Sequence, residues 1–362
     1  MNILITNIEL SKPTGTVTYV SDLAVALQLR GHNVEVFTYR IGSIGLLLKK
    51  QGINVVTRLN KLTNSPDIIH GHHHPTTFEV IQKFKNAPAI FFLHDRTSPL
   101  DHPPKSRQIL KYVAVDYNCV ERFYDEEIDD VYTTVIHNWV NTNKFKLRKS
   151  FSHLPQRALL FSNYATKNNY YKSIDEACTL TGIKLDVLGS GMNTEINNPE
   201  GILLKYDLVF GKAKSAIEAL STGASVIVCD FMGLGTMVNQ SNIGYMIKYN
   251  FGMKTLTRSF DVNSIVDEIK NFDSNQNKLN AITIRKSAAF EKVIPSIIDL
   301  YTNTIKEYAE GKRGMEANTK LEKSKAINLK FYFFIAKTPV LKYFYKAWLH
   351  TYWFIKDKII LR

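Results

Sequence analysis

The chain has 362 residues, of which 44% are hydrophobic and 22% are charged, and its formal net charge is +13. This length suffices for two domains of ordinary size, and the composition excludes wholesale disorder. The positive charge is concentrated at the end of the chain, since residues 312–362 carry 12 Lys and Arg against three acidic residues, a net +9. The rest of the chain is close to neutral, which argues against a nucleic-acid-binding protein.

Cysteine spacing and the first residues indicate the compartment. Cys119, Cys178 and Cys229 are widely spaced, as expected for buried thiols in a reducing compartment. The chain starts with a short strand pattern that lacks the basic leader and long apolar core of a signal peptide. Because no run of 18 apolar residues occurs, no membrane-spanning helix is expected. The sequence therefore predicts a cytoplasmic protein.

The first 38 residues predict a β-α-β unit. Apolar residues 2–6 are typical of a strand, a helix is expected from about Val17 to Arg30, and residues 33–38 alternate as a second strand. The loop between strand and helix contains Gly15 and Thr16. Glycine at this turn would let the backbone approach a ligand closely.

Histidines follow two further predicted strands. His70, His72, His73 and His74 end the first of these strands, and His94 with Asp95 ends the second. A histidine cluster can bind zinc, but no ligand pair at helical spacing and no C-x-x-C motif supports a metal site, so none is predicted. Histidines that are hydrogen-bonded to backbone at strand ends remain an alternative interpretation.

A second β-α-β unit is predicted for residues 206–238. The apolar run Leu208 to Phe210 breaks at Gly211, a helical pattern follows and stops at Gly223, and a second apolar run begins at Ala224. That run ends at Asp230. Gly233 and Gly235 are expected in the loop that follows it.

The first loop of this unit suits a phosphate group. Lys212 and Lys214 lie in it, and near Ser215 the following helix presents free N–H groups and the positive end of its dipole. Glu218 comes about one turn later, too deep for a capping residue. Its carboxylate could accept hydrogen bonds from a ribose.

Several segments, in continuous order over roughly residues 1–310, resemble retaining GT-B glycosyltransferases of the family 4 group. The segments are ALQLRGHNVEV (residues 26–36), the two histidine motifs, the linker 135–145, the Gly-x-Gly that ends strand 184–188, EALSTGASVIV (residues 218–228) and the Gly244-Tyr245 turn. The chain departs from the family pattern at Phe210, where the first glutamate of E-x7-E would stand, and at Asn163, where an arginine would hold the diphosphate.

This resemblance implies an α/β fold of the GT-B type, with two Rossmann-like domains that face an interdomain cleft. Residues 1–150 would form the N-terminal acceptor domain, and residues 151–311 the C-terminal donor domain with a crossover helix. Residues 312–362 lie beyond the resemblance, and their composition predicts a basic, aromatic, helical tail.

The resemblance further implies transfer of a sugar from a UDP- or GDP-linked donor to a glycan or lipid-linked acceptor in cell-surface polysaccharide synthesis. The reaction would retain the anomeric configuration and need no metal or other cofactor. The site residues are assigned by matching to the family motifs or from the chemistry of the loops. The expected catalytic residues are His94, Lys212 and Lys214, and the expected acceptor or cleft residues are His72 and Asp95. The expected donor-binding residues are Gly15, Thr16, Lys212, Ser215, Glu218, Gly233 and Gly235. A catalytically degenerate binding or regulatory protein, motivated by Phe210 and Asn163, is the alternative; a GT-B epimerase fits less well.

The tail predicts contact with a membrane surface. Its last 32 residues contain 11 aromatic residues interleaved with lysines, a combination that suits the headgroup region of an anionic membrane. The protein would then be peripheral to the inner face of the membrane. An ordinary terminal helix packed on the body is the main alternative, and a nucleic-acid-binding tail is less favoured because arginine is scarce.

Overall fold

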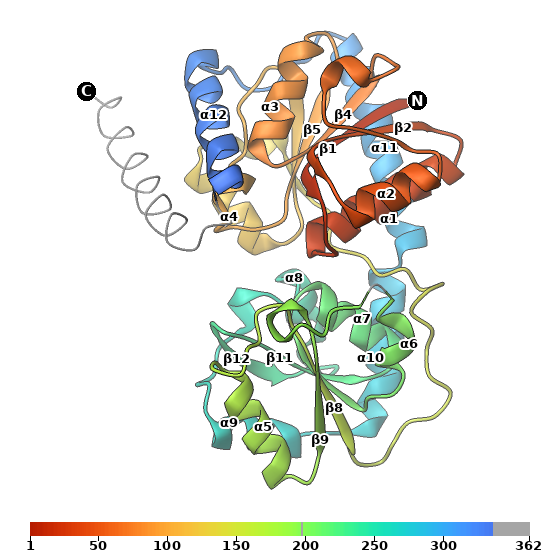
Figure 1. The fold of residues 1–362 in the computed structure, drawn as a ribbon, viewed down its shortest axis with the longest axis vertical. Coiled ribbons are helices and arrows are strands. Elements are labelled where there is room, and N and C mark those ends of the chain that lie inside the picture. Colours follow the sequence, from red (N-terminus) through yellow and green to blue (C-terminus); the bar gives the residue numbers. More distant parts are fainter. Residues whose placement is uncertain (197, 336–362) are drawn as a thin grey trace, which may run out of the picture. The chain divides into compact units, whose positions relative to one another are not determined.

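A computed structural model describes residues 1–196 and 198–335, which form two compact units (Figure 1). Unit 1 comprises Met1–Val113, Phe123–Thr134 and the described residues from Tyr301 onward, and unit 2 comprises Ala114–Arg122 and Val135–Leu300. Helices α4 (Tyr117–Asp125) and α11 (Phe290–Ala309) each belong in part to both units. The domain limits at residues 150 and 311 remain predictions, since units defined by contacts need not follow limits drawn along the chain.

Unit 1 is built on a seven-stranded sheet with the strand order β3-β2-β1-β4-β5-β6-β7. The pairs β2–β3, β1–β2, β1–β4 and β4–β5 are parallel. The strands are β1 (Asn2–Leu10), β2 (Asn33–Ile41), β3 (Asn54–Val56), β4 (Ile68–His72), β5 (Ala89–Leu93), β6 (Ile109–Ala114) and β7 (Thr133–Val135). Every residue of β4 and β5 is buried, as expected for central parallel strands covered on both faces.

The first predicted unit is confirmed, with shifted limits. The strand β1 extends to Leu10, beyond the predicted end at residue 6, and α1 (Gly15–Leu29) begins two residues before the predicted Val17. The other described helices of unit 1 are α2 (Ser43–Lys50), α3 (His74–Lys83), α12 (Thr319–Ile335) and the 3-10 turns η1 (Leu59–Lys61), η2 (Pro99–Asp101) and η3 (Asp130–Tyr132).

The helix α12 packs on α3 and η2, and Figure 1 shows it beside α3. Its Leu329 and Tyr332 are buried, the partly buried Leu100 packs against them, and Phe333 is 7% exposed. The carboxylate of Glu322 is buried against the imidazole of His74, with 3.0 Å between Oε2 and Nε2. The packed-helix interpretation of the tail is therefore confirmed for residues 319–335, whereas residues 336–362 lie outside the described part.

Unit 2 contains a five-stranded sheet in the order β12-β11-β10-β8-β9. Its strands are β8 (Arg157–Phe161), β9 (Lys184–Leu188), β10 (Leu208–Gly211), β11 (Ser225–Asp230) and β12 (Gly233–Met237), of which only β12 is antiparallel to its neighbour within this sheet. Its helices and 3-10 turns are α5 (Tyr171–Leu180), η4 (Ser190–Met192), α6 (Glu200–Leu203), α7 (Lys214–Thr222), α8 (Ile243–Lys248), η5 (Met253–Thr255), α9 (Val262–Lys270) and α10 (Ser274–Ser287).

The alternation of side chains along each strand divides the core of unit 2 into two layers. Val209 packs in the layer that contains α7 and α10, whereas Phe210 packs in the layer that contains α5 and α9. Phe210 is wholly buried and pairs with Leu160 and Ile227 on the neighbouring strands. A glutamate at this position would be an uncompensated buried charge, so packing accounts for the apolar residue.

Two predicted turns are regular structure instead. Gly233 and Gly235 were expected in a loop, but both lie in β12, where a Cβ on Gly235 would approach the carbonyl oxygen of Thr255 to 2.6 Å. Gly244, expected in a turn, lies in α8. Close packing of β12 against η5 therefore requires glycine at position 235, and this requirement cannot be read from one strand alone.

The predicted burial of the three cysteines is confirmed, and all are free thiols. Burial raises the pKa of the Cys178 thiol to about 12. This thiol is therefore protonated and unreactive at neutral pH.

Candidate functional site

The strand order of unit 2 defines a switch point between β8 and β10. From β8 the chain continues to β9 on one side, and from β10 it continues to β11 on the other side. In open parallel sheets, ligands bind at the carboxyl ends of the strands where the order reverses in this way. The loops that follow β8 and β10 therefore flank the expected binding site of this unit.

The loop after β10 is short and fixed by hydrogen bonds. The hydroxyl of Ser215 accepts a hydrogen bond from the backbone N–H of Lys212 at 3.1 Å and donates one to the carbonyl of Lys212 at 2.9 Å. Ala213 donates its N–H to the carbonyl of Phe251 and adopts φ 53° and ψ −122°, a region that non-glycine residues rarely occupy. Strain of this kind persists only where the surrounding structure imposes it, and it is often found at ligand sites.

Lys212 projects its ammonium toward the end of the neighbouring strand β11, where it is paired with the carboxylate of Asp230. The side chain of Asp230 is 2% exposed, whereas that of Lys212 is 24% exposed. Lys212 was predicted from the sequence, whereas its partner Asp230 was not. An aspartate that ends the next strand of a β-α-β unit was the available signal.

The helix α7 begins at Lys214, directly after this loop. Its N-cap residue is Ala213, which supplies no side-chain hydrogen bond to the first turn. The predicted Ser215 lies in the first turn, and Glu218 lies one turn later with 6% of its surface exposed. The structure thus brings four of the predicted residues, Lys212, Lys214, Ser215 and Glu218, onto one loop and the helix that follows it.

The loop after β8 is held against the end of β9. A Cβ on Gly189 would lie 2.0 Å from the carbonyl oxygen of Ser162, and one on Gly191 would lie 2.2 Å from that of Ala165. The backbone N–H of Ser190 donates to the side-chain oxygen of Asn163 at 3.0 Å. The Gly-x-Gly motif therefore serves the close contact between two loops of the unit.

The sheet of unit 1 has its own switch point, between β1 and β4. The loop after β1 leads to Gly15 and Thr16 at the start of α1, and β4 ends at His72. Gly15 is exposed, and a Cβ there would meet no atom within 4 Å. No protein atom therefore requires glycine at this turn, and the close approach of a ligand to Gly15, which does lie at the expected edge of the sheet, stays a prediction.

Three histidines form a continuous cluster at this edge. The Nε2 atom of His94 lies 3.0 Å from Nδ1 of His72, and Nδ1 of His70 lies 2.6 Å from the hydroxyl of Tyr301. The ring of Tyr19 packs edge-on against His94, with 4.7 Å between ring centroids. His72 and His94, predicted as site residues from separate motifs, are thus direct neighbours.

Burial keeps the imidazoles of His70 and His72 neutral. It lowers the pKa of His70 and of His72 well below the ordinary value, with a further contribution from neighbouring histidines. It also lowers the pKa of His73, the N-cap residue of α3, to about 4. The alternative interpretation, in which these histidines are hydrogen-bonded to backbone, holds for His73, because its Nδ1 accepts a hydrogen bond from the backbone N–H of Ile8. His70 is instead hydrogen-bonded to a side chain, the hydroxyl of Tyr301.

Asp95 organises the loop after β5. Its Oδ1 accepts hydrogen bonds from the backbone N–H groups of Thr97 and Ser98 and from the hydroxyl of Thr97. The backbone N–H groups of His94 and Asp95 both donate to Oδ2 of the buried Asp101. These contacts give Asp95 a local structural role, and its predicted contact with an acceptor stays a prediction.

Among the described residues, no group of three or more His, Cys, Asp or Glu side chains is arranged to hold a metal ion. Within the same part of the chain, no helix is both long enough and apolar enough to cross a membrane.

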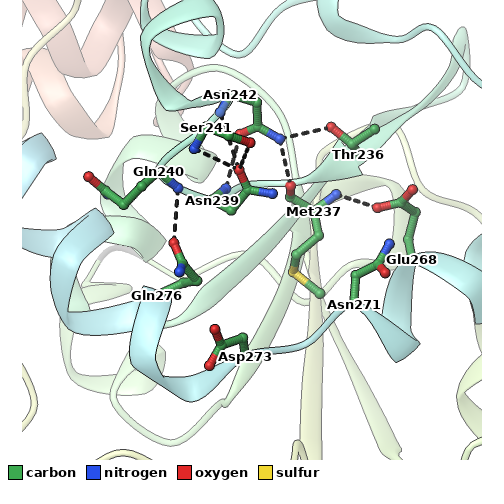
Figure 2. Close-up of a pocket in the computed structure, with 10 residues that line it drawn as sticks. All are labelled: Thr236, Met237, Asn239, Gln240, Ser241, Asn242, Glu268, Asn271, Asp273 and Gln276. Atoms are coloured by element: carbon green, nitrogen blue, oxygen red, sulfur yellow. Dashed lines mark hydrogen bonds between the residues drawn. The ribbon is translucent and has the colours of Figure 1, made fainter.

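A polar pocket of about 800 Å³ lies elsewhere in unit 2 (Figure 2). It is lined by Thr236, Met237, Asn239, Gln240, Ser241, Asn242, Glu268, Asn271, Asp273 and Gln276. Because β12 runs antiparallel, with Met237 paired to Ile227, the residues after β12 lie at the amino edge of the parallel strands, opposite to Lys212. Figure 2 shows several of the lining groups hydrogen-bonded to one another, and the carboxylate of Glu268 accepts a hydrogen bond from the backbone N–H of Met237 at 2.6 Å. None of the described residues that line the pocket is a Lys or Arg that could bind a phosphate.

No family model matches the chain, and no curated protein does. Solved structures match its fold. The HepE protein of Anabaena, in a complex with UDP, has a TM-score of 0.62 and 14% identity, and the match covers 84% of this chain and 100% of that one. A glycosyltransferase from Rickettsia africae has a TM-score of 0.61 and 12% identity over 84% and 98% of the two chains. Sucrose-phosphate synthase from Thermosynechococcus elongatus has a TM-score of 0.58 and 11% identity over 83% and 98%.

The chain has the GT-B fold. The predicted fold class is thereby confirmed for residues 1–196 and 198–335. Identities of 11–15% establish the fold alone, because activity depends on the particular residues at the two sheet edges.

Proposed function

We propose that the protein is a glycosyltransferase that moves a sugar from a UDP- or GDP-linked donor to a glycan or lipid-linked acceptor. The observation that carries the proposal is the placement of Lys212 and the α7 N-terminus at the carboxyl edge of unit 2, beside the switch point. Structures of HepE, which shares the fold, were solved with UDP and with UDP-glucose.

The reaction breaks the bond between the anomeric carbon and the β-phosphate oxygen, and it forms a bond from that carbon to the acceptor oxygen. The acceptor proton leaves with the diphosphate. Negative charge grows on the leaving group, and cations with fixed N–H donors stabilise it without reorganisation. Lys212, Lys214 and the first N–H groups of α7 near Ser215 are the candidates for this task, and Glu218 is the candidate for binding the ribose hydroxyls.

The finer features of the reaction follow from the resemblance to family 4 and belong to the proposal. Retention of anomeric configuration is one of these features. Metal independence is another, because Lys212 and Lys214 supply the charge that a metal would otherwise provide. Addition of a strong chelator should leave the rate unchanged. In unit 1, His94 would contact the donor sugar or the acceptor, with His72 behind it at hydrogen-bonding distance.

We further propose that the acceptor belongs to cell-surface polysaccharide synthesis and is met at the inner face of the membrane. Residues 336–362 contain seven aromatic residues and carry a net +5, from six Lys and Arg against one Asp. Basic residues near an anionic leaflet contribute about 1 kcal/mol each, and inserted rings add to this. A lipid-linked acceptor would then meet the enzyme at high local concentration.

The test is release of nucleoside diphosphate from UDP- and GDP-linked sugars by the full-length protein, with membrane lipid extract as a source of acceptor. Donor-dependent release that needs the extract would support the proposal. The alternative of a degenerate binding protein predicts donor binding without release. The alternative keeps its motive at Phe210, because this buried core residue of β10 supplies no carboxylate to a donor.

A further inference from the structure

An exposed pair of aromatic side chains stands at the carboxyl edge of unit 2. Tyr164 is 60% exposed and Phe231 is 55% exposed, with 5.4 Å between their ring centroids and an angle of 59° between the ring planes. Met232, next to Phe231, is 56% exposed. Exposed apolar groups that gather at one place, rather than singly, mark a binding surface.

The pair lies beside the proposed phosphate site. Tyr164 follows β8 and Phe231 follows β11, and the strand between these two in the sheet is β10, which leads to Lys212. Phe231 is directly preceded by Asp230, the carboxylate that is paired with Lys212. The two rings and the lysine therefore occupy one edge, at and next to the switch point.

Hydrogen bonds hold the backbone of Tyr164 and of Met232, the residue that follows Phe231. The N–H of Tyr164 donates to the hydroxyl of Ser162 at 3.2 Å, and its carbonyl accepts from the side-chain amide of Asn169 at 2.7 Å. On the other side of the pair, the N–H of Met232 donates to the carboxylate of Asp230 at 2.6 Å. Rings on a fixed backbone lose little conformational entropy when a ligand stacks on them.

We infer that Tyr164 and Phe231 form a platform on which the nucleobase of the nucleoside diphosphate stacks, while Lys212 and the α7 N-terminus take the phosphates. The inference rests on the proposed function and assigns the base to residues that no sequence motif identified. A nucleobase is flat and has a π-face on either side, so it complements aromatic rings that are only half covered by the protein. Lys212 would thus bind the charged part of the ligand, and the two rings would bind its apolar part.

The experiment measures binding of UDP and of inorganic pyrophosphate to the full chain by calorimetry. Tyr164→Ala and Phe231→Ala should each weaken UDP binding by about 5- to 150-fold, the range for loss of one stacked base. Both variants should bind pyrophosphate as the wild type does, because pyrophosphate has no base. Tyr164→Phe retains the ring and should retain UDP affinity.

Two further variants keep the test decisive. Phe331→Ala on α12 of unit 1 removes a phenylalanine of nearly equal exposure, 57%, and should leave UDP binding unchanged. Tyr164→Leu keeps an apolar side chain of similar bulk but removes the ring. It should therefore fold normally and bind UDP more weakly than the wild type does.

The possible outcomes separate this inference from the proposed function. Wild-type UDP affinity in both Ala variants would overturn the platform, and the proposed function would stand as long as the wild type binds UDP. An equal loss of pyrophosphate affinity would also overturn it, since the variants would then disturb the phosphate site itself. Failure of the wild type to bind UDP or GDP would overturn the proposed function and the platform together.

Discussion

The ammonium of Lys212 is paired with the carboxylate of Asp230 across the adjacent ends of β10 and β11. The aspartate is almost wholly buried, and the lysine is the partner that reaches the surface. Such a pair fixes the position of a cation more firmly than a solvated lysine could, and a fixed cation needs little reorganisation when charge develops on a ligand.

Lys212→Met should reduce nucleoside diphosphate release about 100-fold or more, because it removes a fixed cation from the leaving group. It should also destabilise the fold by about 3 kcal/mol, since the buried carboxylate of Asp230 loses its partner. The double variant Lys212→Met/Asp230→Asn should recover stability in urea denaturation without recovering the rate. Recovery of both would mean that the lysine acts only through folding.

Glu218→Ala should weaken UDP binding about tenfold or more, because hydrogen bonds to a charged group contribute about 1.5–3 kcal/mol each. Calorimetry with UDP measures the change. Glu176→Ala, on the exposed face of α5, is the matched control and should bind UDP as the wild type does. Unchanged affinity in the Glu218 variant would rule out its contact with the ribose.

Ala213→Gly should stabilise the protein by about 1 kcal/mol. Glycine adopts φ 53° and ψ −122° without the penalty that alanine incurs, and this gain exceeds the entropy that glycine adds to the unfolded chain. The midpoint of urea denaturation should rise. Ala216→Gly, inside α7, should lower it instead, and a lower midpoint for both variants would show that position 213 is unstrained.

The free energy of unfolding should fall as the pH decreases from about 6.5 toward 4. The folded-state pKa of His70, His72 and His73 lies below the unfolded value, so in this window the unfolded chain binds protons that the folded chain excludes. Each histidine contributes a slope of up to about 1.4 kcal/mol per pH unit. The stability is fully present above pH 6.5 and is lost toward the folded-state pKa, which for His73 is about 4.

Urea denaturation at pH 7, 6 and 5 measures this slope. His70→Gln cannot take up a proton but can still accept the hydroxyl of Tyr301, so it should reduce the slope by about 1.4 kcal/mol per pH unit. His153→Gln alters an exposed histidine and serves as the control. An equal slope in wild type and the His70 variant would contradict the assignment.

Two truncations separate the packed helix from the residues beyond it. A chain that ends at Ile335 retains α12 and should keep wild-type stability, whereas a chain that ends at Gly311 loses the contacts of Glu322 with His74 and of Phe333 with Arg40. The shorter chain should therefore unfold at a lower urea concentration. The chain that ends at Ile335 should also sediment less with anionic vesicles than the full-length protein, more so at low salt. Equal sedimentation of these two would place any membrane contact outside residues 336–362.

Local sequence determined most of the elements. Strands β4, β5, β10 and β11 were readable because central parallel strands are buried on both faces and appear as continuous apolar runs. The limits of β1 and the antiparallel β12 were not readable. Gly233 and Gly235 resemble loop glycines, and only the carbonyl of Thr255, 20 residues after Gly235, explains why the strand needs glycine there.

The same division holds for the candidate site. Lys212, Ser215 and Glu218 were predicted because one loop and one helix carry them all, so sequence spacing alone fixes their proximity. The partners Asp230, Tyr164 and Phe231 come from other strand ends, and only the strand order brings them to the same edge. In unit 1, likewise, the histidines were visible as motifs, but the neutrality of His70 and His72 is a consequence of their burial among aromatic rings and other histidines. The sequence by itself determined which residues follow each strand, because hydrophobic period and turn chemistry are local. The tertiary structure decided which of these residues meet and which are desolvated, because sheet order and burial depend on contacts between distant segments of the chain.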